Sequence, residues 1–234
     1  MGSFTPAMLE PLFLTLKVAL LATLIAGALG IAAGHWMARH RFAGQNALDA
    51  VLVLPMVLPP TVLGYYLLIA LGPLTAPGRM LIRIFGHPLA FSFTGLLIGS
   101  VLYSLPFAVQ PLVAGFSSVD TGYVEASAGL GVSPWRTFWS VVMPLSRASL
   151  LTSAVLAFTH TVGEFGVVLM IGGNIPGATR TLSISLYDQV QDFNYAAANR
   201  TALLLLVVSL TALVVIYLLP SVRRTDGRQV DVVR

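Results

Sequence analysis

A histidine and a glutamate, His160 and Glu164, lie four residues apart in a segment that is otherwise apolar. In a continuous helix this spacing places both side chains on one face, where they can share a hydrogen bond or a proton. Ionisable groups inside apolar membrane segments are costly and are usually functional. The pair therefore suggests a proton relay, or a structural or gating role for Glu164. We favour the structural or gating role over direct contact with a substrate.

Other signatures of chemistry are missing from the sequence. It contains no phosphate-binding GxxxxGK[ST] loop, no HExxH and no GxSxG. It has no cysteine, which excludes disulfides and thiol catalysis. Its histidines do not cluster at metal-ligand spacing; they are His35, His40, His87 and His160. We therefore expect no catalytic residue, metal or cofactor in this chain, and no ATP hydrolysis by it.

Prolines interrupt a second apolar segment, LPMVLPPTVLGYY, at Pro55, Pro59 and Pro60. Each proline lacks a backbone donor and disfavours regular helix. Irregular backbone at membrane depth is tolerated only where protein buries it or where it lines a watery cavity. The segment is therefore either a kinked packing helix or part of a translocation path, in which freed N–H groups and hydroxyls could hold an oxyanion. The residues predicted for this path or its gate are Pro59, Pro60, Thr61, Gly64, Ser104 and Glu164.

The composition predicts an integral membrane protein. Of 234 residues, 56% are hydrophobic and only 9% are charged, against roughly 25% charged in soluble domains. Several segments approach the roughly 20 apolar residues that a membrane helix needs. The stretch 73–93 carries arginines and is expected to be a loop with room for a short interfacial helix. We therefore predict an all-α fold with about five transmembrane helices, at 12–34, 51–71, 95–116, 149–171 and 201–219.

The basic residues predict how the chain is oriented. One set of loops and the tail hold Arg39, Arg41, Arg136, Arg147, Arg223, Arg224, Arg228 and Arg234; the other loops hold Arg79, Arg83, Arg180 and Arg200. Cytoplasmic loops are the richer in Lys and Arg. The N-terminus is therefore expected outside, and the C-terminus, with a short basic tail at 221–234, in the cytoplasm. The same bias explains why Lys and Arg outnumber Asp and Glu in this chain. We therefore expect no nucleic-acid partner.

The stretch EASAGLGVSPWRTFWSVVMPLS, residues 125–146, is too polar to cross a membrane. Asp120 is a suitable N-cap for a first helix, and Gly131 can end that helix in a left-handed conformation. Ser133 and Pro134 then start a short amphipathic helix, which we expect Pro144 to stop. Such an element either anchors a loop at the membrane surface or docks on a partner and passes motion to the spans.

This stretch resembles the EAA loop of ABC importer permeases. The resemblance rests on Glu125-Ala126-Ser127, on Gly131 six residues after the glutamate, and on Met143-Pro144, with Ser127 and Met143 replacing the family's Ala and Leu. In that family the loop is a coupling helix that docks in a groove of a cytoplasmic ATPase subunit. The resemblance implies an ATPase-coupling site formed by Glu125, Ala126, Ser127, Gly131, Ser133, Pro134, Trp135, Arg136 and Pro144.

A second resemblance concerns the cargo. The run Gly163-Glu164-Phe165-Gly166, followed by residues 173–181 (GNIPGATRT), is similar to permeases for tetrahedral oxyanions, and most to the molybdate branch. Ala178 departs from the glutamate expected there. The resemblance implies a molybdate importer, with sulfate or tungstate as alternative cargoes. Arg180 lies in an external loop, where it either guides the anion or contacts a delivery protein, or is a plain surface residue.

Together the resemblances imply a type I permease domain over residues 12–220, in a bacterial or archaeal cytoplasmic membrane. They imply a homodimer with cytoplasmic ATPase subunits and a periplasmic or lipid-anchored oxyanion-binding protein, working by alternating access. Two other classes stay open. One is a proton-coupled secondary transporter using His160 and Glu164, and the other is a membrane scaffold that moves no solute.

Overall fold

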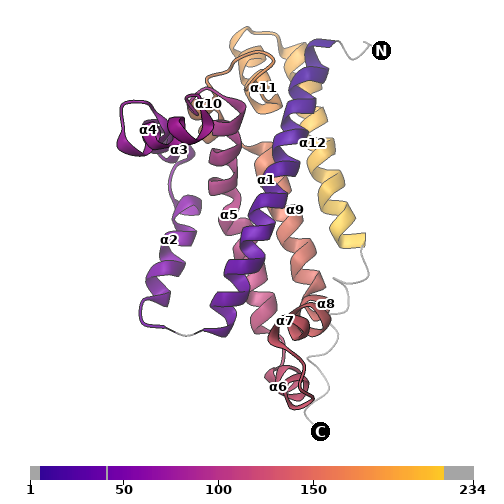
Figure 1. Cartoon of the computed structure of the whole chain (residues 1–234). Helices are drawn as coiled ribbons and strands as arrows, with labels where there is room; N and C mark the ends of the chain where they lie inside the picture. Colours follow the sequence, from indigo (N-terminus) through magenta and orange to yellow (C-terminus); the bar gives the residue numbers. More distant parts are fainter. Residues whose placement is uncertain (1–5, 41, 219–234) are drawn as a thin grey trace.

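The computed structural model describes residues 6–40 and 42–218, and within them every regular element is a helix (Figure 1). Arg41 and the predicted basic tail at 221–234 lie outside the described residues. The elements are α1 (Pro6–Arg39), α2 (Gln45–Val57), α3 (Pro60–Leu71), α4 (Ala76–Phe85), α5 (Phe93–Ser117), α6 (Thr121–Gly129), α7 (Pro134–Thr137), the π-helical turn η1 (Phe138–Val142), α8 (Met143–Leu145), α9 (Arg147–Gly163), α10 (Gly166–Gly172), α11 (Leu182–Gln191) and α12 (Tyr195–Leu218).

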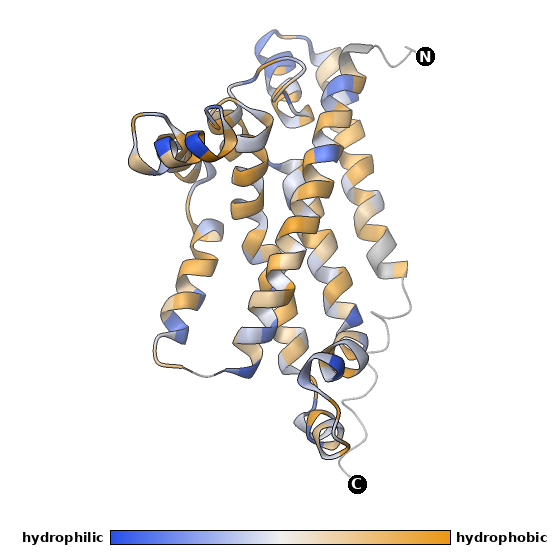
Figure 2. Ribbon diagram, viewed as in Figure 1, coloured by the Kyte–Doolittle hydropathy of each residue, from blue (hydrophilic) through white to orange (hydrophobic). Residues whose placement is uncertain are grey.

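Three of the described helices, α1, α5 and α12, are long and apolar enough to cross a membrane by themselves. Two bent pairs bring the number of crossings to as many as five: α2 with α3, and the helical run Pro134–Leu145 with α9. Hydrophobic residues cover the middle of the bundle, and hydrophilic residues gather toward its two ends (Figure 2). The predicted all-α membrane fold is therefore confirmed.

The second predicted span is two helices rather than one kinked helix. The axes of α2 and α3 differ by 109°. Between them Leu58 and Pro59 are extended, and Pro60 takes the first position of α3, where a missing N–H removes no helical hydrogen bond. The Pro59-Pro60 pair thus ends one helix and starts the next.

The expected continuous helix over 149–171 is wrong. Helix α9 ends at Gly163, Glu164 is extended with φ −70° and ψ 135°, and α10 begins at Gly166. The physical reason is a close approach between two helix starts. A Cβ on Gly166 would lie 2.6 Å from Pro60 Cβ and 3.2 Å from Thr61 N, so a glycine lets the start of α10 rest directly on the start of α3.

The centre of the bundle is formed by α1, α5 and α9, which pack on one another. Helix α1 presents alanines and glycines toward α5, and Ala22 and Ala26 are fully buried. A Cβ on Gly34 would lie 3.1 Å from Leu112 Cβ and 3.3 Å from Val113 N. In lipid, helices associate through such close van der Waals packing between small residues. This trio is the frame on which the two broken segments are held.

Enlarging Gly34 should therefore loosen the frame. We expect Gly34→Leu to destabilise the protein by roughly 1–3 kcal/mol, the usual cost of overpacking, seen as a lower unfolding temperature in detergent. Gly27→Leu on the same helix is the matched control, because a Cβ there meets nothing within 4 Å. Equal unfolding temperatures for both variants would contradict the proposed α1–α5 contact.

Candidate functional site

A cavity of about 520 Å³ lies where the two broken segments meet. Three residues of the predicted path, Pro60, Thr61 and Glu164, line it together with Tyr103 and His160. Pro59 precedes this group as the N-cap of α3 and is exposed. Residues about 100 positions apart in the sequence thus form one site, in which hydroxyl groups and the start of α3 surround an open space.

Two predicted path residues lie beside this cavity rather than on it. Gly64 is buried between α3 and α10, where a Cβ would lie 2.8 Å from Met170 Cβ and 3.0 Å from Val167 Cα. Ser104 is fully buried, and its hydroxyl lies 2.8 Å from Thr161 Oγ1 and 3.1 Å from His160 Nδ1. Gly64 therefore allows α3 to pack closely on α10, and Ser104 ties α5 to α9.

His160 is held by its neighbours and not by Glu164. Its ring stacks on Phe107 at 3.9 Å between centroids and lies 4.6 Å from the ring of Tyr103. The hydrogen bond expected between His160 and Glu164 is not formed, because α9 ends before Glu164 and the chain turns away. His160 Nδ1 pairs with Ser104 instead.

Glu164 is 5% exposed. Neither oxygen of its carboxylate has a partner at hydrogen-bond geometry among the described residues. Its own carbonyl accepts a hydrogen bond from the hydroxyl of Ser183 in α11. The hydrogen bond of the Glu164 carbonyl therefore stabilises the break between α9 and α10. The Glu164 carboxylate is buried and has no partner among the described residues.

The residues predicted for coupling lie together in a protruding segment, residues 121–145, at the end of the bundle opposite α10 and α11 (Figure 1). Asp120 caps α6 by accepting from Gly122 N at 2.8 Å, and Gly131 has φ +73°. Ser133 caps α7 by accepting from Arg136 N, with Pro134 at the first helical position. The expected helix, glycine turn and second helix are all present.

This segment exposes side chains that could contact a partner. Glu125, Ala126 and Arg136 are exposed. Larger exposed side chains are Tyr123 at 58%, Leu130 at 83%, Trp135 at 71% and Trp139 at 48%. Exposed aromatic groups beside charged ones are typical of protein interfaces.

The second helix ends one residue after Pro144, close to the expected stop. The helical run continues through η1 and α8 to Leu145, and the chain bends by 74° before α9. Pro144 lies just before the end of this run, in α8, which directly follows the π-helical turn η1, and its missing N–H removes a hydrogen bond from the last turn. The bend follows at Ser146, whose hydroxyl donates to Gly115 O in α5 at 3.3 Å.

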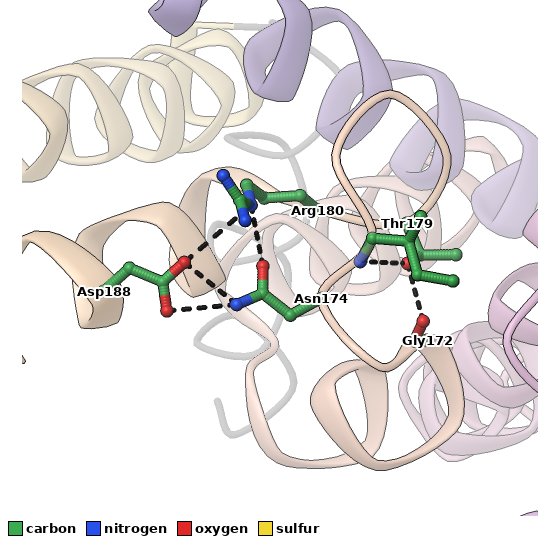
Figure 3. Close-up of polar contacts among 6 residues, drawn as sticks. Gly172, Asn174, Thr179, Arg180 and Asp188 are labelled. Atoms are coloured by element: carbon green, nitrogen blue, oxygen red, sulfur yellow. Dashed lines mark hydrogen bonds and ion pairs between the residues drawn. The ribbon is translucent and has the colours of Figure 1, made fainter.

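Polar contacts fix the loop between α10 and α11, residues 173–181 (Figure 3). Arg180 Nε donates to Asn174 Oδ1 at 2.7 Å and lies 3.7 Å from Asp188 Oδ2, while Asn174 Nδ2 donates to the same carboxylate. Thr179 Oγ1 donates to Gly172 O at 2.6 Å and accepts from Ile175 N at 2.9 Å. The sequence did not reveal Asp188, which lies outside the run 173–181, nor the role of Thr179, because a motif match does not show which backbone groups a side chain binds. The guanidinium of Arg180 thus binds side chains of its own chain, Asn174 and Asp188.

The fold is that of type I ABC importer permeases. A bacterial ABC transporter involved in alginate import matches with a TM-score of 0.75 and 14% identity, over 91% of this chain and 78% of that chain. The inward-facing MetNI methionine transporter matches with a TM-score of 0.69 and 16% identity, over 92% and 96%. The chain belongs to the family of binding-protein-dependent transport system inner membrane components, whose model matches residues 26–224.

Several proteins of known role are more similar in sequence to this chain than these solved structures are. The molybdenum transport system permease protein ModB of Azotobacter vinelandii is 47% identical over 186 residues, 80% of this chain and 82% of the relative. ModB of Escherichia coli K12 is 36% identical over 182 residues, 78% and 80% of the two chains. A probable sulfate transport system permease protein, cysT of Zygnema circumcarinatum, is 33% identical over 211 residues, 90% and 73%.

The loop contacts predict that Thr179→Val lowers stability, because the carbonyl of Gly172 and the N–H of Ile175 lose their shared partner. Leaving such groups unpaired costs about 1–3 kcal/mol. Thr23→Val is the control: among residues 6–40 and 42–218 the Thr23 hydroxyl bonds only to Ala19 O, four residues back in the same helix. The measurement is thermal unfolding in detergent, together with protease cleavage within residues 173–181. A Thr179→Val protein as stable and as resistant as Thr23→Val would contradict the assigned contacts.

Proposed function

We propose that this chain is the permease subunit of an ATP-driven importer that carries molybdate across the cytoplasmic membrane. The observation that carries the proposal is the 47% identity to a molybdenum permease over 80% of the chain. Hydrolysis of ATP is assigned to a separate subunit, since the sequence has no phosphate-binding loop.

The cavity between the broken segments is the candidate path. The first N–H groups of a helix lack intrahelical partners and carry partial positive charge, and they are common binding groups for phosphate-like anions. The start of α3, at Pro60 and Thr61, lies on this cavity. Pro60 has no N–H, and the N–H groups of Val62 and Leu63 bond to Pro59 O. A partly dehydrated tetrahedral dianion would therefore be held by the N–H of Thr61, by N–H groups at the start of α10, and by the hydroxyls that line the cavity. Pro59, Gly64 and Ser104 would keep the helices in place, and Glu164 would act in gating.

The protruding segment is the candidate docking site for the ATPase. Its exposed residues, including Glu125, Ala126 and Trp135, would enter a groove on that subunit together with the half-buried Ser127. The orientation that follows has the N-terminus outside and residues 121–145 in the cytoplasm, because cytoplasmic loops carry the larger share of arginines. Residues 12–220 would form the permease domain, and 221–234 a basic cytoplasmic tail near anionic lipid.

Transport would proceed by alternating access in a homodimer. Closure of the ATPase dimer on ATP would draw the two protruding segments together. Because each segment joins α5 to α9, that movement would reach the helices that carry Ser104 and His160. A periplasmic or lipid-anchored binding protein would deliver the oxyanion to the outward-facing cavity, and hydrolysis would restore the inward-facing state.

Sulfate and tungstate are the second candidate cargoes. The sulfate permease relative, 33% identical over 90% of the chain, supports sulfate specifically. Backbone N–H groups and hydroxyls do not by themselves discriminate between tetrahedral dianions, so selection between them would rest mostly on the binding protein.

The proposal is tested by labelled molybdate uptake into vesicles that contain this chain, its ATPase and its binding protein. We expect uptake that requires ATP and that resists excess unlabelled sulfate. ATP-dependent uptake abolished by sulfate would move the cargo to sulfate. Uptake that is indifferent to ATP but abolished by an uncoupler would overturn the importer assignment in favour of a proton-coupled carrier.

The role of the protruding segment predicts that Gly131→Pro uncouples ATP hydrolysis from transport. Proline fixes φ near −65° and cannot adopt the +73° that the turn requires, so α7 would be misdirected. Gly129→Ala is the matched control, because Gly129 ends α6 and a Cβ there also meets nothing within 4 Å. We expect at least a tenfold loss of uptake per ATP hydrolysed for Gly131→Pro and little change for Gly129→Ala. Normal coupling in both would exclude this segment as the transmission element.

A further inference from the structure

Helix α4 (Ala76–Phe85) is the part of the fold that the proposed function does not use. It lies to the side of the bundle, at the end where α1 begins (Figure 1). Of the helices, it packs mainly on α3. Its sequence, APGRMLIRIF, places two arginines among large apolar residues. Hydrophilic and hydrophobic residues therefore lie directly beside each other on this helix (Figure 2).

Three stripes of side chains run along α4, since residues four apart share a helix face. The stripe that faces the protein includes Leu81, which packs against the core cluster around Leu71 and Leu89. A second stripe is apolar and exposed: Met80 is 65% exposed and Ile84 is 63% exposed. The third stripe, next to the second, is basic.

The basic stripe consists of Arg79 and Arg83, both exposed. Within residues 6–40 and 42–218 neither has a carboxylate within ion-pair distance. Arg79 Nη1 donates to Leu74 O at 2.9 Å, which leaves its other donors available. Leu74 itself is 90% exposed just before the helix. An exposed apolar stripe beside an unpaired basic stripe is the pattern of a helix that lies in a membrane interface.

The joint between α4 and α3 is tight. Thr75 Oγ1 accepts from Gly78 N at 3.2 Å and lies 3.1 Å from both Ala70 O and Gly72 O. A Cβ on Gly78 would collide with the carbonyl oxygen of Gly72. The two helices are thus held at a fixed angle, and whatever holds α4 in place also holds the C-terminal end of α3.

We propose that α4 is a lipid-binding helix whose Met80 and Ile84 enter the acyl-chain region while Arg79 and Arg83 bind the phosphate groups of anionic phospholipids. The occupant is lipid because the chain is a membrane component, because the helix lies at an end of the apolar bundle, and because its basic stripe complements anionic headgroups. Assignment to the outer leaflet rests on the orientation in the proposed function. Held there, α4 fixes the C-terminal end of α3, so that a tilt of α3 would pivot at that end and move its other end, at Pro59 and Pro60 beside the cavity.

The native chain has no cysteine, so a single introduced cysteine can carry a fluorophore. Met80→Cys, Ile84→Cys and His87→Cys are labelled and reconstituted in nanodiscs that contain phospholipid with a nitroxide on the acyl chain. His87 is exposed beyond the end of α4 and serves as the control. We expect quenching at positions 80 and 84 to be at least twofold stronger than at position 87.

A second arm tests the arginines. With the nitroxide on phosphatidylglycerol instead of phosphatidylcholine, quenching at position 80 should rise about twofold, and Arg79→Gln with Arg83→Gln should remove that rise. Quenching at 80 and 84 no stronger than at 87 would overturn the proposal. So would labels that become shielded only when the binding protein or a second copy of the chain is added, since that would assign α4 to a protein partner. The readout needs no transport, so a failed uptake assay leaves this result unaffected.

Discussion

The structure depends on one constraint: a helix that is broken within a membrane must satisfy its freed backbone groups inside the protein. Two segments are broken here, between α2 and α3 and between α9 and α10. Each break is placed against the other, with Gly166 resting on Pro60. The hydroxyl of Ser183 in α11 binds the carbonyl of Glu164. Without these contacts, the irregular backbone would face lipid at a cost of several kcal/mol for each unpaired group.

The helices α1, α5 and α9 form the frame that holds the two broken segments against each other. Small residues let α1 lie close to α5. Polar contacts join α5 to α9, and those contacts are short and buried. Ser153 donates to Ala108 O at 2.8 Å, and Ser104 lies 2.8 Å from Thr161 Oγ1. The loop over residues 173–181 is closed in a similar way, by the amide of Asn174 and the carboxylate of Asp188. A rigid frame of this kind lets two short helices, α3 and α10, border an open cavity.

Two helices, α5 and α9, connect the protruding segment at one end of the bundle to the cavity. The protruding segment lies between α5 and α9 in the chain, and both helices meet again near the cavity at Ser104 and His160. At the opposite end, α4 is joined rigidly to α3 by Thr75 and the close contact of Gly72 with Gly78. The cavity therefore lies between an element suited to a moving partner and an element suited to a fixed membrane surface.

The sequence by itself determined the membrane class, the approximate spans and the turn at residues 130–134, because hydropathy, caps and a glycine with positive φ act over a few neighbouring residues. It also placed Pro60, Thr61 and Glu164 among the path candidates, since prolines and a carboxylate in apolar segments are conspicuous. The tertiary structure alone decided that α9 ends before Glu164, that Ser104 rather than Glu164 binds His160, and that Asp188 holds the loop over residues 173–181. These outcomes depend on contacts between residues up to 100 or more positions apart, and no local pattern encodes which distant backbone will come close enough to require a glycine or supply a hydroxyl.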